Sequence, residues 1–336
     1  MSLRNGRRWL TARATSAGLS LAPRLAPRAI DGIERWLARA GPRLPILAQQ
    51  VAANMRAAGV YSESGFRAYF QQTAQHLSNG LRVFRAHSAG EAITKLVDAE
   101  IRLDGSISHL RHALAAGRGA VVAAPHVCNY LLTLERLSRE VPLRIYLRWS
   151  ADARKRELKQ AWCRAAGLSV LLEPASASDP SSRAAAIVDI LREGLAVVIT
   201  PDIAQASDKG VPVRLFNRQV FLPTGPASIA GLAGAPLVPV FGRVEGRVHT
   251  IMCDEPIEIE SLRRADGGRP AALRRTMQRW ADPFQRFLND TPEAWFLWGD
   301  SRWTRVFHGD PRYAAPIEPT SPNDATARLP RIKGTT

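Results

Sequence analysis

Two polar residues follow apolar runs that are expected to form buried strands. His126 follows the run at 120–124 within the sequence AAPHVCNY, and Asp202 follows the run at 195–200. In an open α/β sheet, ligands bind beyond the carboxyl ends of the strands. A neutral imidazole at such a position can accept a proton from a hydroxyl that attacks a carbonyl. His126 is therefore a candidate general base, and the alternative is a histidine that caps a helix or bonds the backbone.

Positive charge and a predicted helix start lie downstream of Asp202. Lys209, Arg214 and Arg218 are basic, and the sequence PTGPA from Pro223 is expected to open a helix. The first backbone amides of a helix can hold an anion. These residues indicate an anion-binding segment, and the alternative is an ordinary basic loop.

The elements that position these residues alternate between short apolar runs and helical patterns from about residue 100. The strand candidates are 120–124, 143–147, 168–172, 195–200, 237–241 and 248–253. The helix candidates are 128–139, 152–166, 181–193 and 269–288. Strands that alternate with helices of this length predict an α/β fold with a mixed, largely parallel sheet flanked by helices.

The chain divides into three predicted parts. Residues 1–95 are expected to form a basic helical N-terminal layer, because apolar positions recur there at roughly helical spacing. Residues 96–308 are expected to form the α/β domain. Residues 309–336 are rich in Pro, Ser and Thr, which predicts a disordered tail.

Two stretches could be mistaken for targeting or membrane-spanning segments. The arginines near the N-terminus precede an uncharged run of only ten residues, 14–23, which favours a basic surface segment. Residues 219–242 carry no charge, but four prolines and four glycines interrupt them. A lipid-exposed helix would leave backbone groups unsatisfied there. We expect a loop, a short helix and a buried strand.

Composition restricts the class of partner. The 336 residues include 46 Lys and Arg against 30 Asp and Glu, so the formal net charge is +16, and 46% are hydrophobic, which excludes a disordered chain. The positive charge suits nucleic acid, an anionic membrane surface or an acidic protein. Nucleic acid has no other support, because no basic helix, finger or RNA-binding strand motif is present. The three cysteines and the histidines show no metal-ligand spacing, so no metal and no cofactor is assigned.

The two site segments together resemble the lipid A biosynthesis acyltransferases, a family within the lysophospholipid acyltransferase superfamily. AAPHVCNY resembles the HxxNWE motif of that family. The sequence from Pro201 to Val240 is similar to its D-Q, G-V, F-F-G-R, T-P-x-G-P-A and G-A-P-V-V-P-V pattern. Tyr146 and Arg148 resemble its Y-R pair, and PEAWFLWGDSRW from Pro292 resembles its P-E-Q-W-x-W-x-H-x-R-W ending. The resemblance runs from about residue 50 to residue 306.

The resemblance implies an activity. Family members move a fatty acyl chain, usually from acyl carrier protein, to a hydroxyl of a lipid-linked sugar. For this chain we expect transfer from an acyl carrier protein or CoA thioester to a hydroxyl or amine of a lipid or glycolipid-like acceptor. Family members work at the cytoplasmic face of the inner membrane, so a peripheral protein with an anionic membrane surface, an acyl donor and a lipid acceptor as partners is expected. His126 and Asp202 are the candidate catalytic residues. The resemblance implies substrate-binding roles for Asn129, Tyr146, Arg148, Arg214, Arg218, Thr224 and Gly225.

The sequence departs from this family at Leu131, five residues after His126, where members carry a carboxylate. That carboxylate would orient the imidazole and stabilise its charged form. Three explanations are open. Another carboxylate reaches His126, for which Asp202 is suitable and Glu135 lies too far along the helix. Alternatively, the acceptor needs less activation, as an amine would, or the chain is a catalytically impaired homologue that binds lipid or a partner protein.

Further departures predict an altered acceptor. Ile203 replaces the Gln of D-Q, Asn217 replaces the Gly of F-F-G-R, and the histidine of the ending is replaced within residues 299–301. The aromatic run has two interpretations, core packing or a membrane-facing surface, and core packing is favoured. Its members are Trp295, Phe296, Trp298 and Trp303.

Overall fold

The computed structural model describes residues 21–147, 153–172, 180–260 and 267–315. The basic segment expected near the N-terminus and most of the tail expected to be disordered lie outside these residues. No helix within the described ranges is long and apolar enough to cross a membrane.

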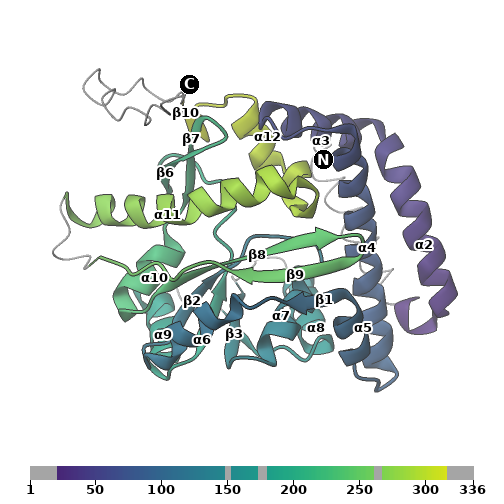
Figure 1. Ribbon diagram of the computed structural model, residues 1–336, viewed down its shortest axis with the longest axis horizontal. Coiled ribbons are helices and arrows are strands. Elements are labelled where there is room, and N and C mark those ends of the chain that lie inside the picture. Colours follow the sequence, from purple (N-terminus) through teal and green to yellow (C-terminus); the bar gives the residue numbers. More distant parts are fainter. Residues whose placement is uncertain (1–20, 148–152, 173–179, 261–266, 316–336) are drawn as a thin grey trace, which may run out of the picture.

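A seven-stranded sheet forms the centre of the molecule (Figure 1), in the order β1-β9-β8-β2-β5-β3-β4. Strands β8, β2, β5, β3 and β4 run parallel, β9 is antiparallel to β8, and β1 is parallel to β9. The strands are β1 (Ile101–Leu103), β2 (Ala120–Ala123), β3 (Leu143–Leu147), β4 (Val170–Leu172), β5 (Ala196–Ile199), β8 (Leu237–Glu245) and β9 (Val248–Cys253). The predicted mixed, largely parallel α/β sheet is thus confirmed.

Helices cover both faces of the sheet. One face packs against α5 (Thr94–Glu100), α6 (Ile107–Ala115), α7 (Tyr130–Ser138) and α8 (Ala153–Ala165), and the other against α9 (Pro180–Arg192), α10 (Gly225–Ala233) and α11 (Gly268–Asp290). Successive residues of β2 therefore enter different apolar clusters, Val121 on one side and Val122 on the other. Burial on both faces explains why the central strands are continuous apolar runs.

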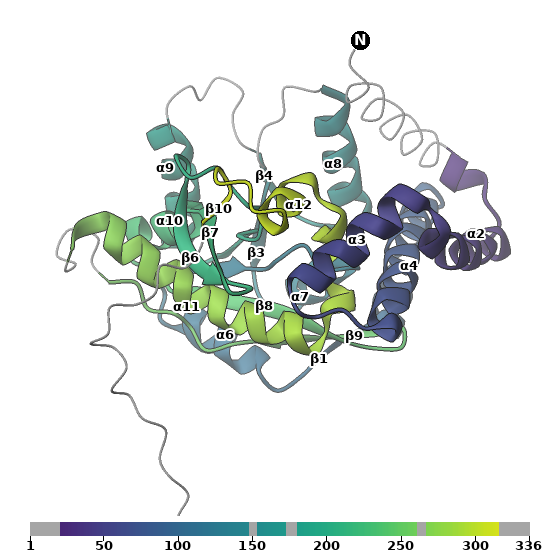
Figure 2. The same ribbon diagram turned by 90° about the horizontal axis from the view of Figure 1, so that it is seen from above.

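The N-terminal region is helical and meets the C-terminal region. It comprises η1 (Ala22–Arg24), α2 (Pro27–Ala40), η2 (Gly41–Arg43), α3 (Pro45–Ala57) and α4 (Glu63–Ser88). Helix α2 packs along α4, and α3 lies beside the C-terminal elements η4 (Phe296–Gly299) and α12 (Ser301–Phe307) (Figures 1 and 2). Segments almost 250 residues apart are joined here, since Asn54 Nδ2 donates to the carbonyl of Trp298 at 2.8 Å.

A second, antiparallel sheet has the order β10-β7-β6 and corrects one prediction. Its strands are β6 (Gly210–Leu215), β7 (Arg218–Pro223) and β10 (Ala314–Ala315). The start of the charge-free stretch is therefore a strand and not a loop, whereas α10 and β8 match the expected short helix and buried strand. The hairpin turn places both Phe216 and Asn217 at positive φ, 54° and 55°. Phenylalanine is uncommon in that conformation, so the usual turn signal was missing.

Candidate active site

His126 and Asp202 meet beyond the carboxyl ends of β2 and β5, which are neighbouring parallel strands. His126 Nδ1 lies 2.7 Å from Asp202 Oδ1, and the His126 backbone N–H donates to Oδ2 at 2.8 Å. A carboxylate only accepts hydrogen bonds, so Nδ1 carries the proton and Nε2 keeps its lone pair. The Asp202 side chain is fully buried, whereas the His126 side chain is 32% exposed. The carboxylate of the pair is therefore buried, and the imidazole is partly accessible to solvent.

Two tryptophans hold Asp202 in place. Trp295 Nε1–H donates to Asp202 Oδ2 at 2.9 Å, and Trp303 Nε1–H donates to the Asp202 backbone carbonyl at the same distance. Both indoles are fully buried, as is that of Trp298. These three members of the aromatic run therefore belong to the core, as favoured from the sequence. Buried indole N–H groups need an acceptor, but the sequence could not indicate that two of them bind the same aspartate.

The electrostatics of the pair follow from burial and mutual attraction. Burial alone would lower the pKa of His126 and raise the pKa of Asp202, because it disfavours charge. Attraction between the two groups and their hydrogen bond outweigh burial, so the pKa of His126 is raised and that of Asp202 is lowered. The carboxylate can thus stabilise the imidazolium that forms when Nε2 accepts a proton. The charges of Arg302 and Asp300 also act on His126, in opposite directions.

Asn129 fixes the turn between the site and α7. Its backbone is left-handed, with φ 58°, and its N–H donates to His76 Nδ1 at 3.0 Å. Its side-chain amide donates to His249 Nε2 at 2.9 Å and accepts from Asn79 Nδ2 at 3.0 Å. The pKa values of His76 and His249 are both lowered to about 4, mainly by burial, so both rings are neutral acceptors. Asn129 is 1% exposed, and its polar groups are used within the protein.

Geometry distinguishes Asp202 from Glu135 as the carboxylate partner of His126 in place of the one absent at Leu131. Leu131 packs with the apolar cluster beneath α7. Glu135 forms an ion pair with Arg139 at 2.7 Å on the next turn. Within the described ranges, Asp202 is the carboxylate that is hydrogen-bonded to His126. The ring of Tyr130 stacks beside the imidazole, with the two centroids 6.1 Å apart.

The remaining residues named from the sequence lie on several elements. Tyr146 is on β3, partly buried against the same apolar cluster as Tyr130, and Arg148 is outside the described residues. Thr224 and Gly225 begin α10, and the Thr224 side chain makes no capping bond. Arg214 is exposed on β6.

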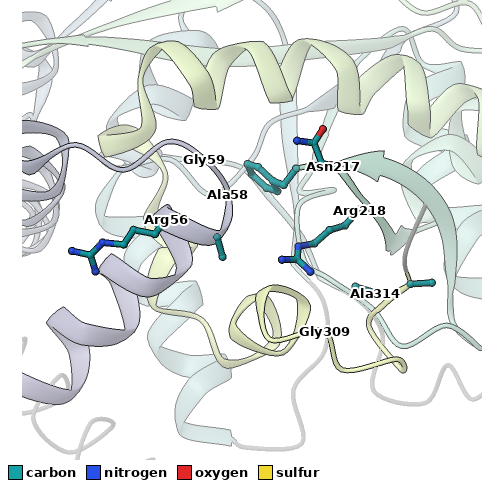
Figure 3. A pocket seen from close by; sticks show the side chains of 10 residues that line it. Arg56, Ala58, Gly59, Asn217, Arg218, Gly309 and Ala314 are labelled. Carbon is teal, nitrogen blue, oxygen red and sulfur yellow. The ribbon is translucent and has the colours of Figure 1, made fainter. Parts of the chain in front are cut away.

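Arg218, by contrast, lines a separate cavity of about 460 Å³ (Figure 3). The Arg218 side chain turns toward Gly309. Arg56 also lines the cavity, but its guanidinium points away from it. Neither His126 nor Asp202 lines this cavity. The structure therefore brings His126, Asp202 and the tryptophans together, and leaves Arg218 at a different surface.

Comparison with known proteins identifies a family. A family model described as bacterial lipid A biosynthesis acyltransferase matches residues 69–305. This range begins in α4, ends in α12 and includes His126, Asp202, Trp295 and Trp303. No curated protein matches the chain.

Proposed function

Because the chain belongs to the bacterial lipid A biosynthesis acyltransferase family, we propose that it transfers acyl chains with His126 as general base and Asp202 as its orienting carboxylate. One observation carries this proposal. His126 Nδ1 donates a hydrogen bond to Asp202 Oδ1, with the two atoms 2.7 Å apart, so the partly exposed imidazole offers Nε2 to a substrate. Asp202 follows the neighbouring strand β5. It supplies the carboxylate that the family carries at the position of Leu131.

The reaction is written as transfer from a thioester to a hydroxyl. Nε2 of His126 removes the hydroxyl proton while the acceptor oxygen attacks the thioester carbonyl, which forms a C–O bond and an oxyanion. Collapse of this intermediate breaks the C–S bond. The imidazolium returns its proton to the departing thiolate, which yields an ester and a free thiol. Asp202 stabilises the imidazolium between these two proton transfers.

The donor is an acyl carrier protein or CoA thioester, and the acceptor is a hydroxyl or amine of a lipid or glycolipid-like molecule. The protein acts peripherally at the cytoplasmic face of the inner membrane. Family membership supports a lipid acceptor, and the net charge of +16 suits both an anionic membrane and an acidic carrier protein. Substrate contacts are proposed for Tyr146, Arg148, Arg214, Thr224 and Gly225, and for Arg218 only with a part of the substrate that reaches the separate cavity. For Asn129, the buried contacts support a positioning role instead.

Acyl transfer is tested with purified protein, radiolabelled acyl carrier protein or CoA thioesters, and a membrane lipid extract. The wild type is expected to label a lipid product and His126→Ala to abolish labelling. His112→Ala, which changes an exposed histidine on α6, is the matched control. Labelling that survives His126→Ala would contradict the general-base assignment. Absence of transfer with every donor would instead favour a catalytically impaired, lipid-binding or partner-binding homologue.

A further inference from the structure

Exposed apolar side chains concentrate at one place on the surface. Seven large apolar residues are exposed in the described part of the chain, and five of them lie within residues 21–47. Four of these, together with two arginines, form what we call the α2–α3 patch. The patch comprises Trp36 (64% exposed), Arg39, Arg43, Leu44 (49%), Ile46 (63%) and Leu47 (38%). Neighbouring residues on α3, such as Ala48 and Val51, are buried in the core instead.

The members of the patch are contiguous. Residues 43–47 are five consecutive exposed positions at the junction of η2 and α3. Trp36 and Arg39 are three residues apart on α2 and therefore share a helix face. Arg43 NH1 donates to the Arg39 carbonyl at 2.6 Å, which joins the end of α2 to the junction.

The charge around the patch is strongly positive. The two acidic residues of α2, Asp31 and Glu34, are both engaged by Arg82, and Glu34 also by Arg247. No arginine between residues 21 and 47 has a carboxylate at ion-pair distance among the residues that the structure describes. These arginines are Arg24, Arg28, Arg35, Arg39 and Arg43. An apolar group that includes Arg39 and Arg43, with further arginines on the same segment, suits an anionic, partly apolar partner.

The patch is connected to the candidate active site. Leu47 packs over Gly299, where an added Cβ would come within 3.1 Å of Leu47 Cδ1. On the next turn of α3, Gln50 Nε2 donates to the Gly299 carbonyl at 3.1 Å. Gly299 directly precedes Asp300, which is paired with Arg302, and the charges of both residues act on His126. Figures 1 and 2 both show α3 beside α12, which begins at Ser301.

We propose that the α2–α3 patch binds the headgroup region of an anionic phospholipid bilayer. Tryptophan and arginine both suit this interface, since the indole lies among headgroups and the guanidinium reaches phosphates while its stem covers apolar surface. A bilayer accepts separate protruding side chains, whereas a protein partner needs a surface that is complementary in shape. The inference rests on the proposed function in that it names the surface from which the site would take a lipid acceptor.

Vesicle co-sedimentation tests the patch without a catalytic readout. The probes are vesicles of phosphatidylcholine mixed with phosphatidylglycerol, and vesicles of phosphatidylcholine alone. Leu44→Gln with Ile46→Gln is expected to weaken binding to the mixed vesicles about tenfold or more. Leu77→Gln with Leu232→Gln is the matched control, because both leucines are exposed on α4 and α10.

Charge is tested separately. Arg39→Gln with Arg43→Gln is expected to remove most of the preference for phosphatidylglycerol and most of the salt dependence of binding. Arg269→Gln with Arg274→Gln, on the exposed side of α11, removes the same charge elsewhere and is expected to change neither. Equal thermal unfolding midpoints among the variants would show that folding is intact.

The outcomes separate this inference from the proposed function. His126→Ala is expected to bind vesicles like the wild type, and the patch variants are expected to acylate a detergent-dispersed lipid extract normally. Wild type that does not bind mixed vesicles, or patch and control variants that bind alike, would overturn the inference. Patch variants that keep vesicle binding but lose association with acyl carrier protein would reassign the surface to the donor.

Discussion

Trp295 Nε1 donates to Asp202 Oδ2 at 2.9 Å, while the other oxygen of the same carboxylate binds His126. The indole is 0% exposed and is packed edge-on against Trp298 and Trp303. The orientation of the carboxylate is therefore determined by the aromatic core as well as by the imidazole. A residue far from the HxxN-like segment controls the group that holds the candidate base.

We predict that Trp295→Phe reduces acyl transfer about tenfold and moves the pH profile. The variant loses one hydrogen bond to a charged group, for which about 1.5–3 kcal/mol is typical. Without that bond, the pKa of Asp202 is depressed less. The matched control is Trp298→Phe, since Trp298 is equally buried but donates to the Pro292 carbonyl at 2.7 Å. Equal pH profiles for the two variants would contradict a positioning role for Trp295.

We predict that Asp202→Asn lowers kcat by about three to four orders of magnitude, as loss of the orienting carboxylate does in serine proteases. The amide cannot stabilise the imidazolium. Glu135→Gln removes a mostly buried carboxylate on α7 that forms an ion pair with Arg139. This variant is expected to leave kcat unchanged. Steady-state rates of thioester consumption measure both. A larger loss in Glu135→Gln than in Asp202→Asn would show that the wrong carboxylate has been assigned.

The pH dependence of activity has a predicted sign. A general base must be neutral, so kcat/KM should rise with pH through the pKa of His126. Since Asp202 raises that pKa, the rise should lie above the ordinary histidine value of about 6.5. In Asp202→Asn the residual activity should rise at lower pH than in the wild type. A rise at the same pH in both proteins would exclude electrostatic coupling between the two side chains.

Acid stability is predicted to depend on His76 and His249. Their folded-state pKa values of about 4 lie below the unfolded value, so the unfolded chain binds more protons between about pH 6.5 and 4. The free energy of unfolding should therefore fall as the pH falls through this window, by about 1.4 kcal/mol per pH unit and histidine. His249→Gln should remove roughly half of this slope. Urea unfolding at several pH values measures it, with exposed His112→Gln as the control.

The His126–Asp202 pair affects the free energy of unfolding at pH values outside the window of His76 and His249. Because the pKa of Asp202 is lowered, its contribution to stability is present above its unfolded value and is lost as the pH falls through its folded pKa. Because the pKa of His126 is raised, its contribution is complete below the unfolded value and is lost as the pH rises through the folded one. Asp202→Asn should thus flatten the loss of stability above neutral pH.

The hairpin turn gives a prediction on stability alone. Phe216 is 5% exposed and its ring lies near those of Trp295, Trp298, Trp303 and Phe307. Phe216→Ala should cost about 3–5 kcal/mol of unfolding free energy. Asn217→Gly changes the exposed neighbour, which shares the positive φ, and should cost little or stabilise slightly. Chemical denaturation compares them, and equal costs would contradict the assignment of Phe216 to the aromatic core.

The sequence by itself determined the α/β fold and the strand ends at which His126 and Asp202 lie. Both are local properties, because a buried parallel strand must be a continuous apolar run and a crossover helix must follow at short range. The sequence also showed that Leu131 cannot orient an imidazole. It left open which carboxylate does so, because strand order was not readable from the runs themselves.

Only the tertiary structure decided that β5 lies next to β2, and with it the 2.7 Å contact between Asp202 and His126. The same holds for Trp295 and Trp303, whose hydrogen-bond acceptor lies about a hundred residues earlier in the chain. It holds for Phe216, whose strained turn is stabilised by aromatic rings from distant segments. Apolar periodicity indicates which residues avoid water, whereas the partners of a side chain depend on how the elements pack in three dimensions.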